Sequence, residues 1–191
     1  MSHLHFPLTA IVSWIRILAN GDATQVAMTG KEGVVGIYLL MGAAHTHNRG
    51  VVQKAGTALR LRISVVLGSF NQGNPVQQLF LRYTRTLLTQ IAQGSVCHRH
   101  HALEQQLCSM LLLMLDRQEG DSISLTHEAI ANLLGVRREG VTQAAKRLMN
   151  DGILNYTRGR ITVLNRAALE RRACECQSVI RDEERRLLTT V

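Results

Sequence analysis

The chain has 191 residues, a formal net charge of +8, 46% hydrophobic residues and 19% charged residues, a balance typical of a folded globular protein rather than a disordered one. No apolar run reaches the roughly 18 residues of a membrane-spanning helix, and the N-terminus lacks the features of a signal peptide. Four cysteines at irregular positions do not form a disulfide framework, so we expect a reduced protein in the cytoplasm.

The first third of the chain is expected to form β structure. Residues 10–28 alternate between apolar and polar side chains on both sides of Asn20-Gly21, and Asn-Gly favours the positive φ angles of a tight hairpin turn. Residues 50–63 are expected to form two more short strands around Ala55-Gly56.

At residue 74 the spacing of the apolar residues changes from alternation to intervals of three and four, which predicts a long helix. Asn74 can cap this helix and Pro75 can be its first residue, where a missing N–H costs nothing. Apolar residues then recur at spacings of three and four over about six turns, which predicts a seam for packing against another helix. We expect the helix to be a dimer or interdomain spine, with a seam of Val76, Phe80, Tyr83, Leu87 and Ile91.

The C-terminal half shows the order helix, turn, helix and two-stranded wing. Thr126 can cap a helix that ends at about Leu134, and a second helix is expected from about Arg138 to Asn150. Two short alternating segments follow, with Arg158-Gly159-Arg160 at the tip between them. This is the order of a winged helix-turn-helix. The motif needs a small residue where the two helices cross, a glycine in the turn, and an aliphatic residue that packs the second helix against the core. These are supplied here by Ala131, Gly135 and Val141.

The two faces of the second helix differ in chemistry. Val141, Ala144, Ala145 and Leu148 cluster on one side, and polar residues lie on the other. Arginine can pair with guanine, glutamate can accept from cytosine, and glutamine can read adenine. The predicted base-reading residues are therefore Arg138, Glu139, Thr142 and Gln143. The basic residues that suit phosphates are Arg137, Lys146, Arg147, Arg158 and Arg160.

Basic charge is concentrated in the same region. Residues 136–166 contain seven basic and two acidic side chains, whereas residues 103–128 are net acidic. This focusing favours a DNA partner. The alternative is a ligand-binding or protein-interaction module whose winged helix does not read DNA and whose charged face is only solvated.

The segment "LTHEAIANLLGVRREGVTQAAKRLMNDGILNYTRGRITVLNRAALERRACEC" closely resembles the C-terminal domain of Crp/Fnr-family transcription regulators. The resemblance continues through residues 81–117 and, more weakly, through "FPLTAIVSW", "GKEGVVGIYLLMG" and "NRGVVQKAGTALRL". It implies an α+β fold with three parts. These are a truncated, cupin-like β-roll in residues 1–73, a dimerisation helix in residues 74–100, and a winged helix-turn-helix domain with a helical tail in residues 101–191.

The resemblance also implies a sequence-specific regulator that binds a two-fold-related DNA site as a homodimer, with RNA polymerase as a further candidate partner. In the family an Arg-Glu pair reads base edges, and Arg138 and Glu139 occupy those places. Gln143 stands where cyclic-AMP-responsive members have a second base-reading arginine, so the preferred site should differ. Arg137 stands at the N-cap position of the recognition helix, where many members have a serine. An arginine side chain cannot accept hydrogen bonds from the unpaired first N–H groups of the helix, so we expect Arg137 to contact a phosphate.

The nucleotide site of the family is matched only in part. Arg49 matches the phosphate-binding arginine, but Gly50 replaces its serine partner and Ile37 stands at the position of the ribose-binding glutamate. We therefore expect Arg49 to mark a degenerate effector site, with no bound cyclic nucleotide and no cofactor. Because the first strands of the roll have no counterpart here, we also expect an incomplete barrel before Asn74.

The cysteines and histidines are not expected to bind a metal. Cys174 and Cys176 are two residues apart and should point to different sides of one helix, which favours incidental buried thiols. The histidines at 45–47 and 98–101 have no cysteine or carboxylate at a usual ligand spacing. No nucleophile–base set, phosphate loop or carboxylate pair is recognisable, so an enzyme is not expected.

Overall fold

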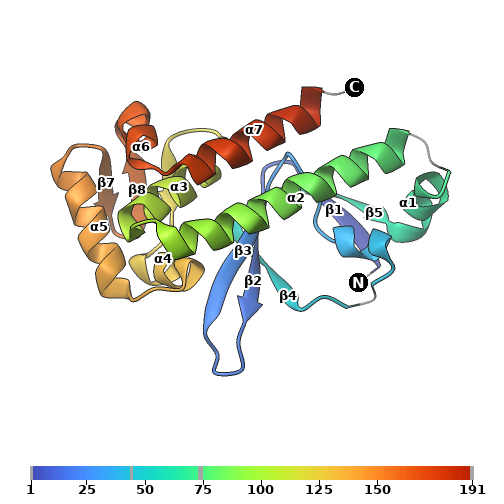
Figure 1. The fold of residues 1–191 in the computed structure, drawn as a ribbon, viewed down its shortest axis with the longest axis horizontal. Coiled ribbons are helices and arrows are strands. Elements are labelled where there is room, and N and C mark those ends of the chain that lie inside the picture. The colour runs from blue at the N-terminus through green and yellow to red at the C-terminus, as the bar shows by residue number, and fades with distance from the viewer. Residues whose placement is uncertain (1, 44, 73–74, 190–191) are drawn as a thin grey trace.

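The computed structural model describes residues 2–43, 45–72 and 75–189, and it has the expected α+β fold class. Figure 1 shows helix α2 (Pro75–His100) crossing the molecule between the N-terminal strands and the C-terminal helices. Helix α7 (Glu175–Thr189) returns along α2. Among the described residues, no helix is both long and apolar enough to span a bilayer.

The N-terminal strands form two antiparallel sheets. In one, β1 (His3–Pro7) pairs with β5 (Ala58–Arg62). In the other, β2 (Ile11–Ile17) lies between β3 (Ala23–Thr29) and β4 (Asn48–Lys54). Within the described residues these strands do not close into an eight-stranded roll, so the predicted incomplete barrel is confirmed.

The predicted local elements of this region are also present. Strands β2 and β3 form a hairpin around Asn20-Gly21, where Gly21 has a φ of 89° and donates its N–H to the Leu18 carbonyl at 3.0 Å. The two strands expected around Ala55-Gly56 are β4 and β5. The short helices η1 (Ile37–Met41) and α1 (Ile63–Phe70) were not predicted.

One face of α2 packs against the N-terminal strands. Phe80 and Tyr83 are buried in a cluster with Leu4 and Trp14. The Tyr83 hydroxyl lies 3.0 Å from the Thr29 hydroxyl, which also accepts the Trp14 indole N–H at 2.9 Å. Burial raises the pKa of Tyr83 to about 12, so its hydroxyl stays protonated.

This packing corrects the predicted seam on α2. The seam residues Val76, Phe80, Tyr83, Leu87 and Ile91 do lie on α2. However, Phe80 and Tyr83 belong to the core of the chain itself, because the sheets supply the apolar surface that covers them. The cap predicted at Asn74 lies outside the described residues.

A buried arginine connects three distant segments. Arg117, only 3% exposed, follows helix α3 (Leu103–Asp116). Its Nε donates to Glu32 at 2.8 Å, its Nη1 donates to the Leu113 carbonyl at 2.8 Å, and it also pairs with Glu184 of α7. Burial disfavours the Arg117 cation, but the two carboxylates outweigh burial and raise its pKa.

The C-terminal elements confirm the predicted order. Helix α3 is followed by a compact group that shares a core with it, in which Leu111 of α3 packs together with Ile130 and Val141. The small sheet has the strand order β6-β8-β7. The group comprises β6 (Ser122–Ser124), α4 (His127–Leu134), α5 (Arg138–Asn150), β7 (Leu154–Thr157), β8 (Arg160–Val163) and α6 (Arg166–Arg172).

Candidate nucleic-acid interface

The turn between α4 and α5 depends on two residues that the sequence singled out. Thr126 caps α4, because its hydroxyl accepts the Ala129 N–H at 3.1 Å. Gly135 ends α4 with a φ of 66°, in the left-handed region that favours glycine. A side chain at Gly135 would also meet the Thr24 hydroxyl, since an added Cβ lies 2.6 Å from it. The β2–β3 hairpin therefore packs directly against this turn.

Helix α5 is fixed by its buried face. Val141, Ala144, Ala145 and Leu148 are all at most 4% exposed. The opposite face is open, and the structure brings four of the predicted residues together there. They line one shallow depression, formed by Arg138, Glu139, Thr142 and Gln143. Guanidinium, carboxylate and amide groups together can match most base edges of a major groove.

Arg137 occupies the N-cap position of α5 in an extended conformation. Its exposed side chain makes no capping hydrogen bond within the described residues, as the sequence predicted. The first N–H groups of α5 and the positive end of its dipole therefore lie next to a guanidinium. This combination suits a phosphate group.

A histidine missed by the sequence analysis limits what Thr142 can do. The His127 ring stacks on Tyr156 with a centroid separation of 4.0 Å, and its Nδ1 lies 3.0 Å from the Thr142 hydroxyl. Burial and then the charge of Arg138 lower the pKa of His127, which favours a neutral ring. The Thr142 hydroxyl donates to the Arg138 carbonyl at 3.1 Å. In this arrangement the hydroxyl proton is engaged within the helix, and Thr142 keeps its methyl group and the acceptor capacity of its hydroxyl oxygen.

The wing tip presents two arginines to solvent. Arg158 has a φ of 49° and Gly159 a φ of 80°, and two successive positive φ angles match the tight hairpin turn that follows the twist of the strands. Arg158 and Arg160 are exposed on either side of this glycine. The turn therefore projects positive charge away from the domain core.

Arg147 differs from the other predicted phosphate contacts. Its Nε donates to Glu104 at 2.7 Å, and Glu104 also accepts from Arg172 at 2.7 Å. The hydrogen bond from Arg147 is the main reason that the pKa of Glu104 is lowered. Arg147 thus ties α5 to α3 within the chain through its Nε, and its side chain is still 57% exposed. Lys146, the next predicted contact, is exposed on α5.

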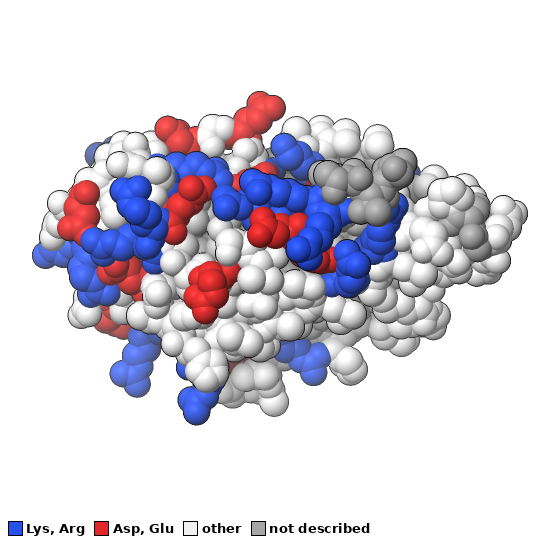
Figure 2. All heavy atoms as spheres, turned by 45° about the horizontal axis from the view of Figure 1, so that its top comes forward, with Lys and Arg blue, Asp and Glu red and all other residues white. Residues whose placement is uncertain are grey.

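The surface charge is uneven. Figure 2 shows lysine and arginine side chains over the winged-helix end of the molecule and along α7, with acidic groups between them. The opposite end in this view is mostly uncharged. On the face shown, basic side chains therefore gather over the end of the molecule that carries α5.

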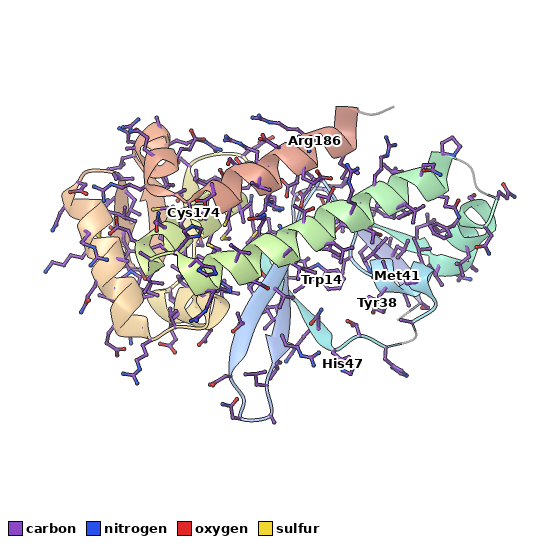
Figure 3. The ribbon with its side chains drawn as sticks, in the orientation of Figure 1. Trp14, Tyr38, Met41, His47, Cys174 and Arg186 are labelled. Atoms are coloured by element: carbon purple, nitrogen blue, oxygen red, sulfur yellow. The ribbon has the colours of Figure 1, made fainter. Side chains whose placement is uncertain are left out.

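The N-terminal part holds a cavity of about 520 Å³. Trp14 and Tyr38 line it, with their rings edge-on at 6.4 Å (Figure 3). From β4, Asn48, Gly50 and Val52 line the cavity, so Arg49 between them points to the other face and is exposed. Arg49 therefore does not line this cavity, and its assignment to a degenerate effector site stays a prediction.

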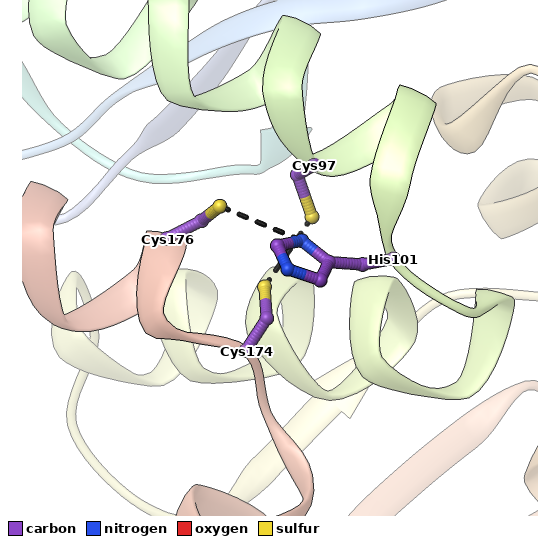
Figure 4. A group of neighbouring side chains, drawn as sticks. All are labelled: Cys97, His101, Cys174 and Cys176. Atoms are coloured by element: carbon purple, nitrogen blue, oxygen red, sulfur yellow. Dashed lines mark hydrogen bonds between the residues drawn. The ribbon is translucent and has the colours of Figure 1, made fainter.

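The structure also brings together four residues that the sequence analysis treated separately: Cys97, His101, Cys174 and Cys176 (Figure 4). Cys174 lies in the link between α6 and α7, whereas Cys176 lies in the first turn of α7. The expectation that the two thiols point to different sides of one helix is therefore wrong, whereas the expected burial of both is confirmed. The spacing Cys97-x3-His101 on a helix was the available signal, since it places both side chains on one face.

Comparisons with known proteins agree with this geometry. Residues 105–172 match the model of the Crp-like helix-turn-helix domain. A sequence comparison with curated proteins gives no match. Among solved structures, TTHB099, a CRP-family transcriptional regulator from Thermus thermophilus, aligns with a TM-score of 0.72 at 19% identity, covering 90% of this chain and 88% of that chain.

FixK2 from Bradyrhizobium japonicum aligns with a TM-score of 0.72 at 17% identity, covering 91% of this chain and 88% of that chain. At these identities the alignments establish the fold, and the domain match establishes the C-terminal module. The chain therefore has the fold of the Crp/Fnr regulators, and its residues 105–172 form a Crp-like helix-turn-helix domain.

Proposed function

We propose that the protein is a transcription regulator that binds a two-fold-related DNA site as a homodimer. The observation that carries this proposal is the open face of α5, where Arg138, Glu139 and Gln143 lie together above a fully buried opposite face. A recognition helix needs this combination, because it must be held rigidly while its polar groups reach base edges.

Each exposed group has a role in this proposal. Arg138 would pair with guanine, Glu139 would accept from cytosine, and Gln143 would read adenine. Phosphate contacts, which position the protein without reading sequence, would come from Arg137, Lys146, Arg147, Arg158 and Arg160. RNA polymerase is a candidate partner of the DNA-bound protein.

The dimer contact is proposed on the outer face of α2. Leu81 is 50% exposed and Leu88 is 61% exposed. These residues are seven apart, so they lie on the same side of the helix, and apolar residues at this spacing suit a helix pair. Two recognition helices would then meet successive major grooves about 34 Å apart.

The remaining assignments follow the same division of the chain. Residues 1–73 would form the sensor region, 74–100 the dimerisation helix, and 101–191 the DNA-binding domain with its tail. The residues lining the N-terminal cavity, all in the described part of the chain, include no arginine or lysine to hold a cyclic phosphate. We therefore propose that the protein does not respond to a cyclic nucleotide. We also propose that it is a non-enzymatic regulator located in the cytoplasm.

Salt-dependent duplex binding tests DNA binding directly. For the full chain on a random duplex, the logarithm of the affinity should fall linearly with that of the salt concentration, with a slope of about −0.9 per phosphate contacted. Arg158→Ala and Arg160→Ala should each reduce the magnitude of the slope by about 1 for each phosphate that the variant no longer neutralises. Fluorescence anisotropy at several salt concentrations measures both.

Arg49→Ala provides a matched control, because Arg49 is an exposed arginine on β4, outside the winged helix. It should leave the slope unchanged. Binding that is insensitive to salt, or a slope that falls equally in Arg49→Ala, would instead support a module that does not read DNA.

A further inference from the structure

Four potential metal ligands converge where α2 ends and α7 begins. Cys97 and His101 lie four residues apart near the end of α2, Cys174 lies in the link after α6, and Cys176 lies in the first turn of α7 (Figure 4). One ligand atom of each residue lies within 4.8 Å of all the others. Three of the four cysteines of the chain therefore share one site with a histidine.

The distances suit a single tetrahedral ion. The sulfurs of Cys97 and Cys174 are 3.4 Å apart, and the Cys176 sulfur is 3.6 Å from Nδ1 of His101. With Zn–S bonds of about 2.3 Å and Zn–N bonds of about 2.0 Å, tetrahedral geometry places ligand atoms about 3.5–3.8 Å apart. A cluster of several irons would need more widely separated sulfurs, and a disulfide would need sulfurs about 2 Å apart.

The surroundings of the four residues orient them toward a common centre. The three cysteines are between 2% and 7% exposed. Nδ1 of His101 faces the sulfurs, while its Nε2 lies 3.3 Å from the Glu175 carboxylate. Metal-binding histidines commonly donate their second N–H to a carboxylate in this way. The amide of Gln106 donates to the His101 carbonyl at 2.8 Å, which holds the end of α2 in place.

We propose that Cys97, His101, Cys174 and Cys176 bind one Zn²⁺ ion. Three thiolates and one neutral imidazole form a soft, four-coordinate set, which leaves no open position for substrate and is typical of structural zinc sites. Binding releases the three thiol protons to solvent. The ion fixes the start of α7 to the end of α2, next to the junction between α2 and α3.

Metal content tests the site. The full chain, purified under reducing conditions without chelator, should hold one equivalent of zinc. Cys174→Ala and Cys176→Ala should lose it. Cys108→Ala is the matched control, because Cys108 is a fully buried cysteine on α3 outside the four-residue group, and this variant should keep one equivalent.

Cobalt substitution of the wild-type chain keeps the test decisive even when a cysteine variant fails to fold. Titration of the zinc-free protein with Co²⁺ should produce the visible absorption of tetrahedral cobalt thiolate, saturate at one equivalent, and be reversed by Zn²⁺. Glu175→Gln should retain the site but weaken the affinity by about 10–100-fold, measured by competition with a chelator.

Three results would overturn the proposal. The first is no zinc in the wild-type chain together with no tetrahedral cobalt spectrum. The second is unchanged zinc content in folded Cys174→Ala and Cys176→Ala. The third is bound iron and sulfide, or a Cys97–Cys174 disulfide, in protein that has been kept reduced and free of oxygen.

Discussion

Replacing Arg117 with methionine is expected to lower the free energy of unfolding by about 3–5 kcal/mol, the cost of removing one partner from a buried ion pair. The side chains of Glu32 and Glu184 are each 13% exposed, and both depend on this guanidinium. Methionine fills the space but leaves two carboxylates close together without a cation. Urea denaturation measures the loss.

Two controls separate the charge effect from packing. Arg185→Met removes an arginine from an exposed pair on α7, where Arg185 and Asp182 are 67% and 57% exposed; such a pair contributes at most about 1 kcal/mol. Combining Arg117→Met with Glu32→Gln and Glu184→Gln should recover part of the loss, because no buried charge is then unpaired. If Arg117→Met lowered the free energy of unfolding as little as Arg185→Met, the buried ion pairs of Arg117 with Glu32 and Glu184 would not be important for stability.

Arg138→Ala is expected to have the largest effect on sequence-specific binding. A bidentate arginine–guanine contact contributes about 1–3 kcal/mol, and a homodimer makes it twice, so the loss should be about 2–6 kcal/mol for a symmetric site. The loss should be confined to one base pair in each half-site. Competition binding with single-base variants of the site measures this.

Arg158→Ala is the appropriate comparison, because the wing arginine is proposed to touch only phosphate. It should weaken binding about equally on all duplexes and leave the base preference intact. If Arg138→Ala also weakened specific and scrambled duplexes to the same extent, Arg138 would not be a base-reading residue.

The helix-turn-helix could be predicted from sequence because its signals are local. The Thr126 cap, the Gly135 turn and the polar face of α5 depend on residues within a few positions of one another. The hairpin at Asn20-Gly21 was predictable for the same reason, since its turn chemistry is encoded in two residues.

Features that depend on distant parts of the chain could not be predicted. The apolar face of α2 was recognised, but the pattern does not say whether a sheet of the same chain or a second chain covers it. The ion pair between Arg147 and Glu104 was not predictable, because Glu104 lies 43 residues earlier in the chain. Whether Arg49 points into the cavity depends on which face of β4 lines it, and this follows from strand pairing rather than composition.

The cysteine–histidine group was missed for a similar reason. Cys97 and Cys174 are 77 residues apart, and they meet only because α7 folds back along α2. The break between α6 and α7 at Ala173 separates Cys174 from the helix that contains Cys176. A prediction that assumed one continuous helix necessarily placed the two thiols on different sides.

Selection of bound sequences from random duplex DNA tests the central claim most directly, because it reports binding, specificity and symmetry in one measurement. The proposal predicts enrichment of two inverted half-sites whose centres are about 10 base pairs apart, or a multiple of that spacing, with a preference altered by Arg138→Ala. Recovery of unenriched sequences, or of one unpaired half-site, would contradict a homodimer that reads DNA with α5.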